Sequence, residues 1–170
     1  MAVFVALLRA VNVGGTGKLP MTDLKKLCED AGCTDVRTYI ASGNVVLRST
    51  LTESRLKSVL EKKLHAYAGK QVGVMVRTAA EMKGVVKQNP FPKGAPNRVV
   101  AIFLDKPPSR DAIASVSGRK DEELGLGKRE IYVHYGDGMG TSKLRIAAAK
   151  DGTARNMNTV SKLAAMAEEL

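Results

Sequence analysis

The chain has 170 residues, of which 44% are hydrophobic, and it carries a formal net charge of +10. This length suits one domain, or two small subdomains with a shared core, and the apolar content is sufficient to fill it. The longest apolar run, residues 2–8, ends at Arg9 and is shorter than the roughly 18 residues that a membrane helix needs. The N-terminal segment also lacks the pattern of a secretory signal, so we expect a cytosolic protein with no membrane partner.

The first half of the chain is predicted to follow the order strand, helix, hairpin, helix, strand. Apolar side chains on both faces indicate a covered strand, and an apolar stripe at helical spacing indicates each helix. The segments are a strand at 2–9, a helix at 21–31, a hairpin of 35–40 and 44–49 linked by 41–43, a helix capped by Thr52 and ended by Gly69, and a strand at 72–77. This order is that of the split βαβ, or ferredoxin-like, arrangement.

The second half begins after a helix near 79–88 and a proline-rich segment, 89–97, that leaves no room for regular structure. Its predicted elements are strands at 99–104, 122–126 and 130–135, helices at 109–117 and 142–150, and a terminal helix with Asn158 or Thr159 as the cap and Val160, Leu163, Ala164 and Ala167 as the buried stripe. The order resembles that of the first half, without a sequence repeat. We therefore predict an α+β fold of two ferredoxin-like (split βαβ) subdomains that share one core, with limits at 1–88 and 98–170.

The two cysteines, Cys28 and Cys33, are too few for a tetrahedral zinc site, and the sequence places no histidine near them. We therefore predict no metal. Cys28 lies on the apolar face of the first predicted helix and Cys33 follows the end of that helix, a pattern typical of reduced thiols in a cytosolic protein. A structural disulfide is the disfavoured alternative.

The basic excess gathers in the middle of the chain, where residues 55–98 contain ten lysines and arginines against Glu61 and Glu81. Such a stretch attracts nucleic acid and other polyanions. The alternative is a solvated helix face that keeps the protein in solution. An RNA-recognition module also needs exposed aromatic side chains, and the central strands offer only Phe4, so open-sheet RNA binding is disfavoured.

Residues 9–18 form a glycine-rich turn that follows the first strand and carries Arg9 and Lys18. Successive backbone N–H groups in such a turn can point toward an anion, since glycine adopts positive φ without strain. The turn is not a nucleotide P-loop, because Asn12 stands where that motif has its first glycine and Leu19 where it has the hydroxyl. Two alternatives stay open here, an anion cradle and a plain tight turn.

Polar residues at the hairpin, Ser42 and Asn44, and a second glycine-rich turn before Lys143 repeat this pattern. Ser42 and Asn44 also fit plain turn chemistry, because Ser and Asn bond to their own backbone in turns. A Ser-His-Asp triad has little support, since His65 is predicted mid-helix and His134 in a strand. The carboxylates cluster on helices, where solvation explains them, so the residues identify no catalytic group and no cofactor.

Five segments together resemble an uncharacterised bacterial family, domain of unknown function 1697. The matching segments are 6–15, 20–24, 38–45, 138–144 and 153–163, and the resemblance covers nearly the whole chain. Two positions depart from the family: Ala10, where it more often has glycine, and Met157, where it commonly has an aromatic residue. The resemblance implies an α+β fold of two ferredoxin-like subdomains and supplies no activity.

We expect this protein to bind a small anionic or nucleotide-like ligand between its glycine-rich loops. The candidate ligand-binding residues come from four separate loops: Arg9, Asn12, Gly14, Gly15, Lys18, Ser42, Asn44, Lys143, Arg155 and Asn156. Arginine grips a phosphate or carboxylate with two hydrogen bonds, and lysine adds a point charge. Two alternatives stay open, a nucleic-acid-binding module that uses the 55–98 stretch and a structural or interaction protein without a ligand.

Overall fold

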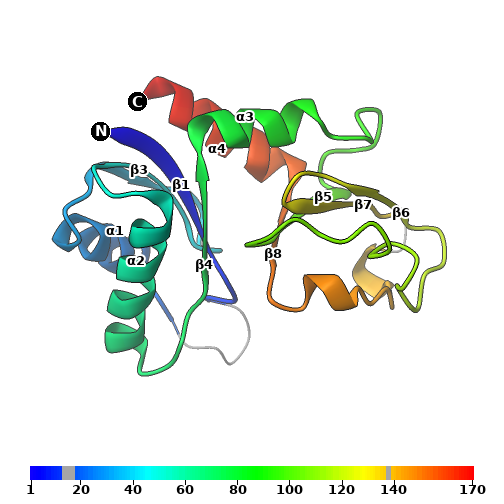
Figure 1. The fold of residues 1–170 in the computed structure, drawn as a ribbon, viewed down its shortest axis with the longest axis horizontal. Coiled ribbons are helices and arrows are strands. Elements are labelled where there is room, and N and C mark those ends of the chain that lie inside the picture. The colour runs from blue at the N-terminus through cyan, green and yellow to red at the C-terminus, as the bar shows by residue number, and fades with distance from the viewer. Residues whose placement is uncertain (13–17, 137–138) are drawn as a thin grey trace. The chain divides into compact units, whose positions relative to one another are not determined.

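The computed structural model describes residues 1–12, 18–136 and 139–170 (Figure 1). Over these residues the chain has an α+β fold with two four-stranded antiparallel sheets and four α-helices, none of them long and apolar enough to span a bilayer. The elements before residue 90 are β1 (Ala2–Leu8), α1 (Met21–Asp30), β2 (Thr34–Thr38), β3 (Asn44–Ser49), α2 (Glu53–Ala68), β4 (Val74–Thr78) and α3 (Ala79–Lys87). Those after it are β5 (Val99–Phe103), β6 (Glu123–Leu126), β7 (Glu130–His134), the 3-10 turns η1 (Met139–Thr141) and η2 (Ala147–Ala149), β8 (Thr153–Asn156) and α4 (Met157–Glu169).

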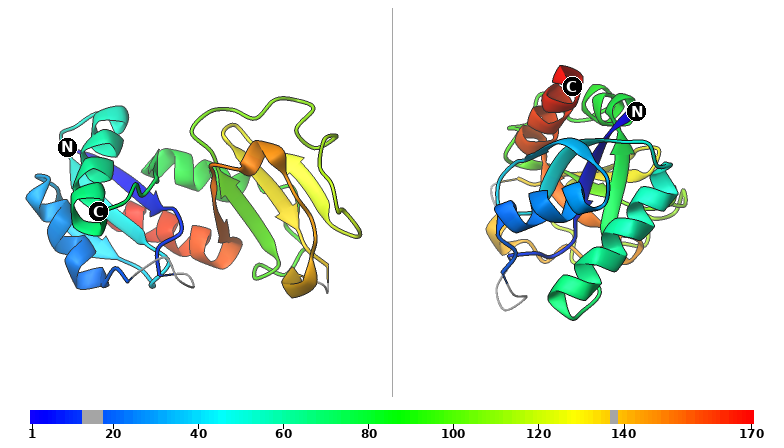
Figure 2. Two further views of the ribbon diagram at one scale, coloured as in Figure 1. Left: turned by 90° about the horizontal axis from the view of Figure 1, so that it is seen from below. Right: turned by 90° about the vertical axis from the view of Figure 1, so that its left-hand side faces the viewer.

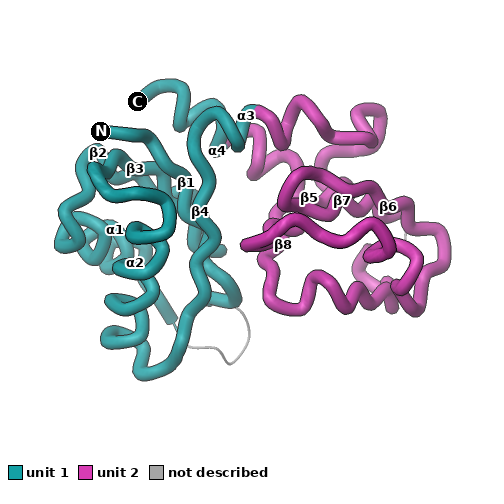
Figure 3. The backbone as a smooth tube through the Cα atoms, viewed as in Figure 1, with its two compact units in different colours: residues 1–83, 163–170 teal, residues 84–162 magenta. Residues whose placement is uncertain are grey.

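These elements divide into two compact units, which Figure 3 colours separately. Unit 1 comprises Met1–Lys83 and Leu163–Leu170, and unit 2 comprises Gly84–Lys162. The end of α4 therefore belongs to unit 1, where ion pairs join Glu168 to Lys83 at 3.1 Å and Glu169 to Arg37 at 3.4 Å. The limits 1–88 and 98–170 for two folding domains, with 89–97 as their linker, stay a prediction.

Unit 1 is built on a sheet with the strand order β2-β3-β1-β4, in which every neighbouring pair is antiparallel (Figure 1 and Figure 2). On one face Phe4, Ala6 and Leu8 pack with apolar residues of α1 and α2. On the other face Val5 and Leu7 are fully buried as well. The prediction that the first strand is covered on both faces is confirmed, and the buried Phe4 offers no platform on which an RNA base could stack.

Helix α2 begins and ends where the sequence predicts. The Thr52 hydroxyl accepts a hydrogen bond from the Arg55 N–H at 3.3 Å and so caps the first turn. Gly69 ends the helix in the left-handed conformation, with φ +72°.

The two cysteines lie at the end of α1, where the Cys33 N–H donates to the Cys28 carbonyl at 3.1 Å. Together with Gly32 at φ +87°, this bond forms a Schellman-type helix end, in which the residues at these two positions pack together. Both cysteines are free, buried thiols. Burial, helped by Cys33 and Glu29, raises the pKa of Cys28 to about 12, so this thiol stays protonated and serves as a core residue.

Unit 2 repeats the strand arrangement with the order β6-β7-β5-β8, again antiparallel throughout. Each strand holds the place that the corresponding strand of unit 1 holds, so the predicted likeness between the halves is confirmed for the sheets. Val100, Ile102, Ile131 and Val133 pack into one core on a face of this sheet.

The two helices predicted within unit 2, at 109–117 and 142–150, are wrong. The first segment forms successive turns, and the second contains only the short 3-10 turn Ala147–Ala149. Ser117 and Arg145 pair with each other instead: the Ser117 N–H donates to the Arg145 carbonyl at 3.0 Å, and the Arg145 N–H returns a bond of 2.8 Å. These bonds use backbone groups that each helix would need for its own ladder.

Strand β8, at Thr153–Asn156, is absent from the sequence-based prediction. Its buried residues, Thr153 and Arg155, are polar, so no apolar alternation marks the strand. Asn156, not Asn158 or Thr159, caps α4, because its Oδ1 accepts from the Thr159 N–H at 3.0 Å. The predicted buried stripe of α4 is confirmed for all four residues, Val160, Leu163, Ala164 and Ala167.

Candidate functional site

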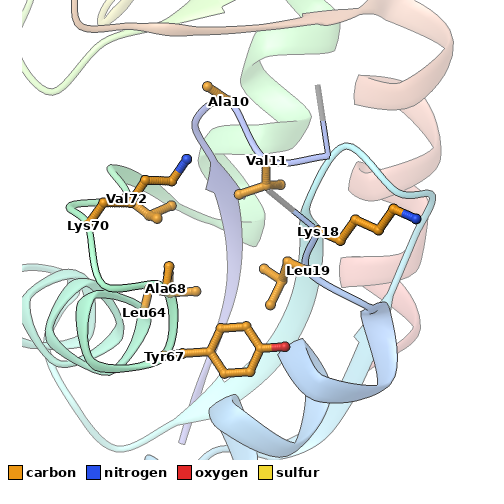
Figure 4. Close-up of a pocket in the computed structure, with 9 residues that line it drawn as sticks. All are labelled: Ala10, Val11, Lys18, Leu19, Leu64, Tyr67, Ala68, Lys70 and Val72. Atoms are coloured by element: carbon orange, nitrogen blue, oxygen red, sulfur yellow. The ribbon is translucent and has the colours of Figure 1, made fainter. Parts of the chain in front are cut away.

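A pocket of about 220 Å³ opens in unit 1, where residues from the end of α2 face the turn that follows β1 (Figure 4). Its floor is apolar and consists of Val11, Leu19, Leu64 and Val72, none of them more than 6% exposed. The other lining residues are Ala10, Lys18, Tyr67, Ala68 and Lys70. An apolar floor with basic side chains around it suits a small ligand that carries negative charge.

Two lysines bring positive charge to this pocket. In Figure 4 the Lys70 ammonium points toward Ala10, and the Lys18 side chain leaves the opposite wall with its ammonium directed outward. Both side chains are exposed, and the flexible four-carbon stem of lysine can move its charge over several ångströms. Arg9 lies next to the lining but not in it, with Cβ and Cδ 3.7 Å from where a Cβ of Gly73 would stand.

Tyr67 forms one end of the pocket, and its ring points toward α1 (Figure 4). Its hydroxyl donates to Oδ2 of Asp23 at 2.6 Å. This hydrogen bond to a carboxylate raises the pKa of Tyr67, because ionising the phenol would remove it. The bond holds the ring across the pocket end.

Asn12 closes the base of the turn that carries Lys18. Its amide Nδ2 donates to the carbonyls of Leu19, at 2.9 Å, and Ala41, at 2.8 Å, and its Oδ1 accepts from the Leu19 N–H at 2.6 Å. One side chain thus joins both ends of the turn to the β2–β3 link. Asn12, proposed from the sequence as a ligand-binding residue, positions the pocket wall through these backbone groups.

Ser42 and Asn44 also make local bonds at the β2–β3 link. The buried Asn44 amide donates to the Tyr39 carbonyl and to the Ser42 hydroxyl, each at 2.9 Å. These contacts are the turn chemistry that the sequence left open as an alternative. Neither residue lines the pocket.

Backbone strain gathers at this end of unit 1. Ala10, Asn12 and Ile40 have φ values of +54°, +54° and +50°, in the region that L-residues rarely adopt. For Ala10, this φ gives a physical reason why glycine suits the position. Strained residues of this kind tend to cluster at binding sites, where the surrounding structure holds them in place.

Replacing Ile40 by asparagine is expected to stabilise the protein by about 1 kcal/mol, because asparagine adopts this φ far more readily than a β-branched residue. Ile40 is 49% exposed, so little packing is lost. Thermal unfolding should show a rise of about 2–4 °C for a chain of this size. Ile40→Val keeps the branched side chain and serves as the control. An equal rise in both variants would show that strain at this φ is not the cause.

The remaining sequence-predicted site residues are placed as follows. Gly14 and Gly15 lie outside the described residues. Lys143 is exposed in unit 2 and lines a separate pocket there. Arg155 is 8% exposed, its Nη1 donates to Thr153 Oγ1 at 2.7 Å, and desolvation lowers its pKa to about 10. Asn156 caps α4. Neither Arg155 nor Asn156 lines the pocket of unit 1 or the one that contains Lys143.

The basic 55–98 stretch does not form one exposed surface. Arg77 is 1% exposed within the sheet of unit 1. Lys57 is engaged by Glu61 Oε2 at 2.9 Å and by the Val74 carbonyl at 2.7 Å, and Lys83 pairs with Glu168. Arg77 is therefore not available to a nucleic-acid surface, and the charges of Lys57 and Lys83 are paired with carboxylates.

Tyr67 and Lys70 are pocket residues that sequence reasoning missed. The helical spacing of Tyr67 from Leu60 and Leu64 predicts that it belongs to the buried stripe of α2, and this prediction is wrong, because Tyr67 is 48% exposed. Lys70 follows the end of that helix. The available signal was Gly69, which ends α2 and turns the chain toward Val72 and β4. Nothing local to these residues indicates that β1 and its turn lie opposite, because that depends on the β1–β4 pairing.

Residues 1–132 match a family model described as "Protein of unknown function (DUF1697)". Among solved structures, a conserved bacterial protein from Streptococcus pneumoniae, SP0830, is similar with a TM-score of 0.80 and 22% sequence identity, over 98% of each chain. At this identity the likeness shows the fold alone. No curated protein matches the sequence.

Proposed function

This chain belongs to the DUF1697 family of proteins of unknown function, and on that premise we propose that unit 1 binds a small anion with a short apolar part. The apolar part lies on the pocket floor, and the anionic group lies within reach of Lys70 and Lys18. The observation that carries the proposal is the combination of a buried apolar floor and two lysines in one pocket. The proposed anion site therefore lies within unit 1 and does not include the candidate residues of unit 2.

The physical basis is the complementarity of the two parts. Burying apolar ligand surface is favourable by about 25 cal/mol per Å², so the floor contributes affinity without specificity. Charge-assisted hydrogen bonds from an ammonium to a phosphate or carboxylate contribute more per contact and orient the ligand. The pocket is small, so the ligand it suits has only a few carbon atoms beside its anionic group.

The test is a calorimetric titration of the full chain with n-butyl phosphate and with inorganic phosphate. We expect butyl phosphate to bind more tightly, and Lys70→Ala to weaken its binding by about tenfold or more. Lys25→Ala, an exposed lysine of α1 outside the pocket lining, is the matched control and should bind as the native protein does. Equal affinity in Lys70→Ala and native protein, or no binding of butyl phosphate, would overturn the proposal.

The same titration separates the two alternatives. A nucleic-acid-binding protein would bind a short single-stranded oligonucleotide with affinity that falls steeply with salt and is reduced in Lys62→Ala/Lys63→Ala. A structural protein would bind none of the three probes, which fits the local roles of Asn12, Asn44 and Asn156. A cytosolic location remains part of the proposal. The assignment of unit 1 as ferredoxin-like is likewise ours, and its strand order β2-β3-β1-β4 together with α1 and α2 supports it. Unit 2 shares this strand order but has no α-helix at 109–117 or 142–150.

A further inference from the structure

Unit 2 contains a pocket of about 430 Å³ that is independent of the proposed anion site. Its walls are formed by residues 118–122 and 141–143, and the backbone pairing of Ser117 with Arg145 joins these two segments. The lining residues are Gly118, Lys120, Asp121, Glu122, Thr141, Ser142 and Lys143. Its volume falls in the range of pockets that hold small organic ligands.

Gly118, in one wall of the pocket, and Gly136, which contacts Asp121 from outside the lining, each allow a close approach that a Cβ would block. A Cβ on Gly118 would stand 2.0 Å from the Lys143 carbonyl oxygen, and Gly118 also has φ +67°. A Cβ on Gly136 would stand 2.2 Å from Oδ2 of Asp121. Gly136, in the second glycine-rich turn of the sequence, therefore leaves the space that the Asp121 carboxylate occupies.

Glu122 is a buried carboxylate in this pocket, with 3% of its surface exposed. Its Oε1 accepts from the Lys120 N–H at 2.6 Å, and its Oε2 accepts from the Ser142 hydroxyl. These hydrogen bonds lower the pKa of Glu122, so the group is charged at neutral pH. Within the part of the chain that the structure describes, no cationic side chain forms an ion pair with it.

The charges around the pocket are balanced, with two carboxylates, Asp121 and Glu122, and two ammonium groups, Lys120 and Lys143. A ligand with a single charge would be attracted by one of these pairs and repelled by the other, although of the four charged residues only Glu122 is buried. A ligand with both charges satisfies both sets. The hydroxyls of Thr141 and Ser142 lie on the same lining and suit a polar ligand.

We propose that this pocket of unit 2 binds a zwitterion of the α-amino acid class. The ligand ammonium group lies at Glu122 and Asp121, and its carboxylate lies at Lys120 and Lys143. The buried Glu122 provides the fixed part of the site, since two hydrogen bonds hold its carboxylate in place.

Three probes with similar carbon chains test this proposal by calorimetric titration of the full chain. L-norleucine carries both charges, hexanoate only the carboxylate and pentylamine only the ammonium. We expect norleucine to bind at least about tenfold more tightly than either single-charge probe, with loss of that advantage in Glu122→Gln. Lys128→Ala, an exposed lysine of the β6–β7 turn outside the pocket, is the control and should bind norleucine normally.

Gly136→Ala tests the same site if Glu122→Gln fails to fold. The added methyl group displaces the Asp121 carboxylate, a side-chain end that can move, so we expect a folded protein with weakened norleucine binding. Equal binding of hexanoate or pentylamine and norleucine, or no binding of norleucine at about 10 mM, would overturn the proposal. Norleucine binding that persists in Lys70→Ala separates this site from that of unit 1, and any hexanoate signal that Lys70→Ala removes belongs to unit 1.

Discussion

Gly43→Ala is expected to destabilise the protein by about 3 kcal/mol, the sum of a conformational and a packing cost. Gly43 lies in the β2–β3 link with φ +87°. A Cβ there would stand 2.7 Å from Val11 Cγ2 and 2.8 Å from Leu8 Cβ. Neither atom can move freely, because Leu8 Cβ is fixed to the backbone of β1 and the Val11 side chain is branched. Thermal unfolding should shift by about 6–12 °C to lower temperature.

Gly32→Ala provides the matched control for this measurement. Gly32 has the same φ of +87°, but a Cβ there would have no atom within 4 Å. Its replacement therefore costs only the conformational part, about 1–2 kcal/mol. The difference between the two variants isolates the close approach of the β2–β3 link to β1. If the two variants lose equal stability, that approach contributes nothing.

Asn12→Ala is expected to cost about 4 kcal/mol, the sum of three lost hydrogen bonds and the strain of alanine at positive φ, and to weaken anion binding in unit 1. The substitution removes three hydrogen bonds to backbone groups, each worth about 1 kcal/mol, and leaves an alanine at positive φ. The walls at Val11, Lys18 and Leu19 then lose their anchor, so we expect butyl phosphate affinity to fall by about tenfold. Urea unfolding and calorimetric titration measure the two effects.

Asn12→Gly separates the two contributions at this position. Glycine adopts the φ of +54° without strain but makes none of the three hydrogen bonds. We expect it to lose less stability than Asn12→Ala and to lose the same binding affinity. An Asn12→Gly variant with native stability and native affinity would show that the side chain does not hold the turn.

Local sequence patterns determined most of the secondary structure of unit 1. The apolar run at 2–8 predicted a strand buried on both faces, and Thr52 and Gly69 predicted the limits of α2. These signals are readable because side-chain periodicity and cap chemistry act over only a few residues. The stripe on α4 was predictable for the same reason.

Tertiary contacts decided the elements that local patterns predicted wrongly. The segments at 109–117 and 142–150 have helical spacing, yet Ser117 and Arg145 pair across 28 residues and take up the backbone groups that helices would use. Strand β8 carries the buried Arg155, a charged residue whose guanidinium donates to Thr153 Oγ1 of the same strand. Contacts at such separations leave no periodic trace in the sequence.

The sequence by itself indicated the family, the α+β class and the basic and glycine-rich character of the turns. Only the tertiary structure decided the place and role of each candidate ligand-binding residue. Lys18 lines a pocket of unit 1, Asn12 and Asn44 hold turns through hydrogen bonds, and Lys143 lines a different pocket in unit 2. Residue type and spacing fix which chemistry a side chain can perform. Which groups meet around one cavity depends on strand pairing and helix packing between distant segments, and these exist only in the folded chain.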